Sequence, residues 1–81
     1  MKLSELLDGM EMVSVTKARN LDCIGWKDGY LLVKFYGRPD RWIYGPNIPE
    51  AEKDKILRVP FPDKLFSTNI RNRYKSYKIG S

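Results

Sequence analysis

The 81-residue sequence contains no histidine and only one cysteine, Cys23. Without histidine it can form neither a Ser-His-Asp or Cys-His nucleophile relay nor a zinc site with imidazole ligands. One cysteine makes no disulfide within the chain, and the apolar neighbours of Cys23 predict a buried, inert thiol in a reducing compartment. We therefore expect a cytoplasmic protein without a metal or another cofactor.

Long hydrophobic runs are also absent, and none approaches the ~20 residues that a membrane-spanning helix needs. The first residues carry an early acid, Glu5, with no long apolar stretch behind it, so we expect no signal peptide and no membrane partner. Hydrophobic residues make up 42% of the chain, which is too much for a disordered protein. The sequence thus predicts one small folded domain over residues 1–81, with no room for a second lobe.

Positive charge is concentrated near the C-terminus. Lysine and arginine number 15 against 10 acidic residues, which gives a net charge of +5. Residues 1–61 hold ten basic and nine acidic side chains, whereas residues 62–81 hold five basic ones against Asp63 alone. This balance favours an anionic partner, and it disfavours the role of an acidic nucleic-acid mimic.

Residues 21–36 carry the clearest local signal, which is a β-hairpin. Two apolar runs flank Asp28-Gly29, and glycine there supplies the positive φ that a tight two-residue turn needs. This turn predicts a register in which Ile24 lies opposite Val33. The register gives one apolar face, formed by Ile24, Trp26, Leu31, Val33 and Phe35, and one mixed face, formed by Cys23, Lys27, Tyr30, Leu32, Lys34 and Tyr36.

Further strands are expected on either side of the hairpin. One lies within 10–16, and a turn over 37–40 leads into another over 41–44. A four-residue loop at this turn places Phe35 opposite Trp42. The aromatic residues of the last strand then join the apolar face of the hairpin.

Helices are expected at both ends of this strand region. Ser4 is predicted to cap a short N-terminal helix. Pro49 is expected as the first residue of a second helix that ends near Arg58. Its buried stripe is expected to consist of Ala51, Ile56 and Leu57.

A last helix is expected to be capped by Asp63 or to begin slightly later. Its apolar residues recur at spacings of three and four, and they are Leu65, Phe66, Ile70, Tyr74 and Tyr77. The order of elements predicts an α+β fold. In this fold a small antiparallel β-meander of three to four strands packs against two C-terminal helices.

A series of short motifs runs through the sequence in a fixed order. The residues that carry it are Ile24-Gly25-Trp26, Leu31, Val33, Phe35, Gly37, Trp42, Tyr44, Ile48-Pro49, Phe66, Ile70, Arg71 and Tyr74. In order and spacing they resemble the KTSC domain family, named after a C-terminal extension of some lysyl-tRNA synthetases and also found as small bacterial and phage proteins. The resemblance covers 13–77, with departures at 58–64 and at Ser67, and leaves an N-terminal segment over 1–12 and a tail over 78–81. It implies a compact β-meander with C-terminal helices, but no defined biochemical activity.

Cations and tyrosines alternate in the C-terminal segment and recur on the mixed face of the sheet. Lysine and arginine displace counterions from phosphates, and aromatic rings stack on unpaired bases. The sequence therefore predicts a non-enzymatic module that binds RNA or single-stranded nucleic acid through a basic, aromatic-bearing C-terminal helix. The candidate binding residues are Lys34, Tyr36, Arg41, Lys64, Arg71, Arg73, Tyr74, Lys75, Tyr77 and Lys78.

Structural roles for these residues remain open alternatives. Tyr74 and Tyr77 also fit packing positions, Arg71 could pair with Asp22, Asp40 or Glu50, and the N-terminal segment could cover the mixed face. A second functional class is a phage-type accessory or inhibitor protein that binds a host protein, such as an RNA polymerase subunit or a defence nuclease. An enzyme is disfavoured, because the aspartates lie in turns and strand ends and no pair has a spacing that fixes two carboxylates on one face.

Overall fold

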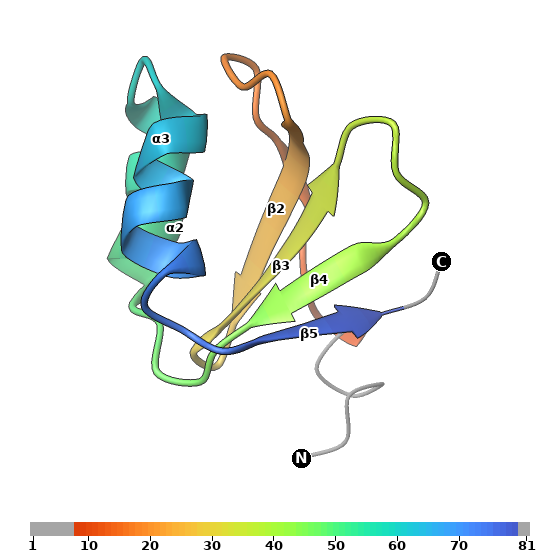
Figure 1. The fold of residues 1–81 in the computed structure, drawn as a ribbon. Coiled ribbons are helices and arrows are strands. Elements are labelled where there is room, and N and C mark those ends of the chain that lie inside the picture. The colour runs from red at the N-terminus through yellow and green to blue at the C-terminus, as the bar shows by residue number, and fades with distance from the viewer. Residues whose placement is uncertain (1–7, 80–81) are drawn as a thin grey trace.

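The computed structural model describes residues 8–79, in which a five-stranded antiparallel sheet carries helices on one face (Figure 1). The strands follow one another in sequence order across the sheet. They are β1 (Val13–Ser14), β2 (Leu21–Lys27), β3 (Tyr30–Phe35), β4 (Arg41–Tyr44) and β5 (Ser76–Ile79). The predicted α+β fold class is confirmed, with one strand more than the expected three to four.

The β2–β3 hairpin has the predicted turn and register. Asp28 and Gly29 both have positive φ, at 51° and 86°, as a two-residue type I′ turn requires. Ile24 lies opposite Val33, as expected. Local turn chemistry therefore determines the pairing of the two longest strands.

The register between β3 and β4 differs from the prediction by two residues. Trp42 lies opposite Val33 instead of Phe35, because the connection between the strands is longer than the expected four residues. Side chains alternate between faces with a period of two, so an even shift leaves the residues of β4 on their predicted faces. Trp42 and Tyr44 accordingly stay on the apolar side.

The helical layer begins with α2 (Glu50–Arg58), which covers one face of the sheet. Pro49 occupies the N-cap, one position before the predicted place, and Glu50 and Glu52 lie in the first turn, where acidic side chains favour the helix dipole. Ile56 is buried as predicted. Ala51 is exposed, so its expected place in the buried stripe is wrong.

The predicted last helix is too long. Helix α3 (Pro62–Phe66) continues into one π-helical turn, η1 (Ser67–Arg71), and the chain then becomes strand β5. Tyr77 therefore lies on a strand, and the expected basic C-terminal helix does not exist beyond Arg71. The backbone of β5 pairs with β4, and this tertiary pairing overrides the helical spacing of the side chains.

The main core lies between the sheet and the helices. Its buried side chains are Val15, Leu21, Ile24, Leu31, Val33, Tyr44, Ile48, Ile56, Phe66 and Ile70. Trp26 also packs against this core, and its indole Nε1–H donates a hydrogen bond of 2.7 Å to the carbonyl oxygen of Ile48. This contact joins β2 to the segment that leads into α2.

The opposite face of the sheet is partly covered by the N-terminal segment. Met10 and Met12 pack there against Leu32 and Ile43, which settles an alternative that the sequence left open. The segment passes so close to Gly25 that a Cβ atom there would lie 2.7 Å from the sulfur of Met12. The strand expected within 10–16 is present only as the two-residue β1. The helix expected at Ser4 falls mostly outside the described residues.

Cys23 lies half-buried on this second face rather than fully buried. Partial burial and the neighbouring Asp22 carboxylate raise the pKa of its thiol, while Lys34 lowers it less. A raised pKa disfavours the reactive thiolate, which supports the expected inertness. Among residues 8–79, no helix is long and apolar enough to cross a membrane.

Candidate functional site

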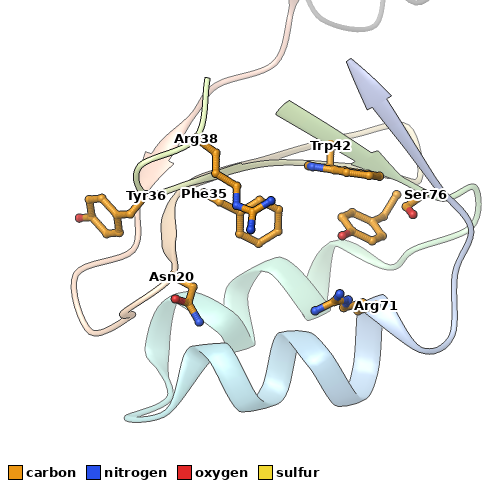
Figure 2. Close-up of a pocket in the computed structure, with 8 residues that line it drawn as sticks. Asn20, Phe35, Tyr36, Arg38, Trp42, Arg71 and Ser76 are labelled. Atoms are coloured by element: carbon orange, nitrogen blue, oxygen red, sulfur yellow. The ribbon is translucent and has the colours of Figure 1, made fainter. Parts of the chain in front are cut away.

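A cleft of about 430 Å³ lies between the sheet and the helical layer (Figure 2). Aromatic side chains from β3, β4 and the start of their connection form much of its wall, and arginines reach it from both layers. Its lining residues are Asn20, Phe35, Tyr36, Arg38, Trp42, Tyr44, Arg71 and Ser76. The cleft thus combines ring faces with cationic groups within one domain.

The aromatic wall is held in place by ring contacts with the core. Phe66 of α3 packs edge-on against Tyr44, with ring centroids 5.2 Å apart, and against Phe35 at 5.9 Å. Such edge-to-face pairs stabilise a defined ring orientation. The cleft therefore presents rings whose positions are fixed before any ligand enters.

One end of the cleft is closed by the loop between β1 and β2. The backbone N–H of Tyr36 donates to the carbonyl oxygen of Asn20 at 2.8 Å, which attaches this loop to the sheet. The N–H groups of Arg19 and Asn20 donate to the two carboxylate oxygens of Asp63 at 2.7 and 3.2 Å, which attaches the loop to α3. The same loop thus bridges both layers at the Asn20 end.

Asp63 does not act as the expected helix cap. Pro62 already occupies the first turn of α3, where its missing N–H costs no hydrogen bond, and Phe61 precedes it at the N-cap. The Asp63 carboxylate therefore lies beyond the capping position, and it accepts hydrogen bonds from the distant loop instead.

The other end of the cleft is closed where the chain passes from η1 to β5. The N–H of Gly45 donates to the carbonyl oxygen of Lys75 at 3.1 Å, and Ser76 then lies opposite Tyr44 in the sheet. In Figure 2 this crossing joins the helical layer to the strand beside Ser76. Both ends are therefore bounded by backbone.

Arg38 and Arg71 give the cleft its charge. They come from opposite layers, Arg38 from the β3–β4 connection and Arg71 from the end of η1 (Figure 2). Within residues 8–79, no acidic side chain lines the cleft, and no carboxylate forms an ion pair with either arginine. Two guanidinium groups that line one cleft without such partners favour an anion.

The expected acidic partners of Arg71 pair with lysines instead. Asp22 lies 4.0 Å from the Nζ atom of Lys34, and Glu50 lies 3.5 Å from that of Lys53. Asp40 pairs with Lys78 at 3.1 Å. Among the described residues, the alternative in which one of these acids pairs with Arg71 is therefore not observed.

Tyr44 is the most buried residue of the cleft, with 4% of its surface exposed. Burial raises the pKa of its hydroxyl, and the positive charge of Arg71 lowers it by a smaller amount. The phenol therefore stays protonated at neutral pH, where it can donate a hydrogen bond.

The predicted binding residues are divided among several surfaces. Of the ten, Tyr36 and Arg71 line the cleft, and Lys78 lies opposite Trp42 in the neighbouring strand. The structure places three others on the second face of the sheet, namely Lys34, Arg41 and Tyr77. The remaining four are Lys64 on α3 and Arg73, Tyr74 and Lys75 in the connection to β5, where Tyr74 packs against the core.

Six lining residues were not among the sequence candidates. They are Asn20, Phe35, Arg38, Trp42, Tyr44 and Ser76. The family-like motif included the aromatic ones, but as core positions of the meander. Nothing in the sequence signalled Arg38, because its partner Arg71 lies across the cleft and 33 residues further along the chain.

No protein-family model and no curated protein matches the chain. Among solved structures, it is similar to the crystal structure of a KTSC domain protein from Yersinia pestis. The TM-score is 0.77 at 19% sequence identity, and the match covers 89% of this chain and 100% of that one. The chain therefore has the fold of a KTSC domain, as its motifs predicted.

Proposed function

We propose that this protein is a non-enzymatic module that binds RNA or single-stranded nucleic acid in the cleft between Arg38 and Arg71. The observation that carries the proposal is the pair of arginines, without a described acidic partner, beside the rings of Phe35, Trp42 and Tyr44. A nucleotide presents the complementary groups, which are an anionic phosphate and a flat base.

The chemistry of each group fits this ligand. A guanidinium group donates two parallel hydrogen bonds to phosphate oxygens, and it stays charged at any physiological pH. Stacking of one base on an aromatic ring contributes about 1–3 kcal/mol. Single-stranded RNA or DNA leaves its bases free for such stacking, whereas a duplex does not.

The cations outside the cleft have a different role in this proposal. Lys34 and Lys78 already pair with aspartates, and Arg73 and Lys75 lie in the connection that follows η1. We assign them a long-range attraction for the phosphate backbone, which raises the association rate and weakens with salt.

A comparison of two neighbouring arginines tests the proposal. Arg71 lines the cleft, whereas Arg73 is exposed two residues later and does not. In titrations of labelled single-stranded RNA, Arg71→Gln is expected to weaken binding about tenfold, and Arg73→Gln by less than about threefold. Equal losses would contradict a role for the cleft, and an absence of RNA and DNA binding at low salt would overturn the proposed function.

A second candidate function is supported by a groove around the connection between α2 and α3. Phe61 is 74% exposed beside a shallow apolar groove of about 260 Å³. The groove is lined by Val59, Pro60, Phe61, Lys64, Leu65, Thr68 and Asn69. An exposed aromatic ring of this kind is a typical anchor for a protein partner.

A pull-down from nuclease-treated bacterial lysate tests this second candidate. One stoichiometric protein that is captured by the wild type and lost with Phe61→Ser would support it. Capture that is unchanged by Phe61→Ser, or lost after nuclease treatment, would contradict a protein partner at this groove.

A further inference from the structure

We infer that the cleft accepts one nucleotide at a time, with the base inside against the aromatic wall and the phosphate at the rim. The remainder of the strand passes across the opening. This inference rests on the proposed function and specifies the unit of nucleic acid that is recognised.

The closed ends of the cleft exclude a strand that runs through it. At the Asn20 end, the loop bonded to Tyr36 and Asp63 bridges the sheet and α3. At the Ser76 end, the chain itself crosses from η1 to β5. A strand of several nucleotides therefore cannot lie along the cleft, and a ligand has to enter from its open side.

Burial decides which part of the nucleotide lies inside. Phe35 and Trp42 are half-buried, so part of each ring is accessible in the cleft, whereas Tyr44 is buried and offers little surface to a ligand. Arg38 and Arg71 are exposed, so their guanidinium groups lie towards solvent. Half-buried rings below a cationic rim match a base that is inserted first while its phosphate stays outside.

The volume of the cleft agrees with the binding of a single nucleotide. Its volume of about 430 Å³ falls in the lower part of the range of ~300–1,000 Å³ that is typical of small-ligand sites. At the two ends, Asn20 and Ser76 carry side chains that can donate and accept hydrogen bonds, which suits the polar edge of a base.

Oligonucleotides with missing bases test this inference. We would compare three labelled eight-nucleotide strands, one with all its bases, one with a single central base among abasic units, and one that is entirely abasic. The single-base strand is expected to bind within about threefold of the complete strand, and the abasic strand to lose at least about tenfold, as one lost stacking contact predicts.

Other outcomes separate the inference from the proposed function. Affinity that rises with each added base would overturn the single-nucleotide site and leave nucleic-acid binding intact. Equal affinity of the abasic strand would also overturn it, because only the backbone would then be recognised. If none of the strands binds at low salt, the proposed function itself fails.

Tryptophan fluorescence gives an independent measurement. Trp42 lines the cleft, whereas Trp26 donates its indole N–H to Ile48 and does not line it. A nucleoside monophosphate is expected to quench the wild-type emission, and Trp42→Phe is expected to abolish the change. Trp26→Phe, the matched control, should retain it. Quenching that persists in Trp42→Phe would contradict insertion of a base at this wall.

Discussion

The Asp63 carboxylate accepts a hydrogen bond from the backbone N–H of Arg19 at 2.7 Å, across 44 residues of sequence. Its second oxygen accepts another from Asn20 at 3.2 Å. These bonds attach the loop between β1 and β2 to the start of α3, and the same loop closes one end of the cleft. One acidic side chain thus links the helical layer, the loop and the candidate site.

Removal of this carboxylate is expected to loosen the loop. Asp63→Ala should lower the free energy of unfolding by about 1 kcal/mol, because two backbone N–H groups lose their acceptor. Asp63→Asn keeps one acceptor oxygen and should cost less. Urea unfolding measures both variants, and an Asp63→Ala protein as stable as the wild type would show that water replaces the carboxylate without loss.

The two arginines of the cleft are expected to act on one phosphate. Arg38→Gln and Arg71→Gln should each lower the salt dependence of RNA binding by less than about one unit in the log–log slope, because the other arginine still neutralises part of the charge of the shared phosphate. The double variant should lose less affinity than the two single losses combined, because both groups serve the same ligand. Arg41→Gln, on the opposite face of the sheet, is the control and should leave binding within about threefold of the wild type. If the losses in binding free energy of the two single variants add fully in the double variant, the two arginines contact separate phosphates.

Two glycines with positive φ provide a matched test of the turns. A Cβ atom at Gly29 would lie 3.0 Å from the backbone nitrogen of Asn47, whereas one at Gly37 would meet nothing within 4 Å. Both alanine variants force a strained backbone, which costs about 1 kcal/mol, but Gly29→Ala adds a clash and should cost about 2–3 kcal/mol. In thermal or urea unfolding, Gly29→Ala should therefore be less stable than Gly37→Ala. Equal stabilities would contradict the close approach of Gly29 to the backbone of Asn47.

The pKa of Tyr44 predicts a loss of stability in alkali. Burial raises this pKa above the value of about 10 that the unfolded chain has, so the folded state holds the phenol proton more tightly. The stabilisation that depends on the protonated Tyr44 side chain is therefore fully present below pH ~10. It is lost as the pH rises through the pKa that Tyr44 has in the folded protein. Tyr44→Phe should remove this part of the pH dependence in urea unfolding.

Arg71 should influence the same titration. Its positive charge favours the phenolate of Tyr44, so Arg71→Gln is expected to raise the pKa of Tyr44 further. Phenolate absorbance during an alkaline titration measures this change, with Arg73→Gln as the control. A shift of equal size in both variants would indicate a general effect of net charge.

Sequence alone was sufficient where structure depends on near neighbours. Asp28-Gly29 specified the hairpin register, because only a tight turn with positive φ joins the two apolar runs. Pro49 and the following acids placed the start of α2 to within one residue. Alternation correctly predicted the faces of β3 and β4, which a two-residue error in the pairing of β4 did not change.

Tertiary structure decided what depends on distant contacts. The spacing of Tyr74 and Tyr77 favoured a helix, but the edge of β4 offered backbone partners to residues 76–79, and pairing made them a strand. The cleft arose in the same way, since Arg38 and Arg71 line one cleft only when the helical layer packs against the sheet. The sequence therefore determined the local elements and the faces they bury, whereas packing between the layers decided which cations and rings share a site. No local pattern encodes a contact between residues that the chain brings together from different layers.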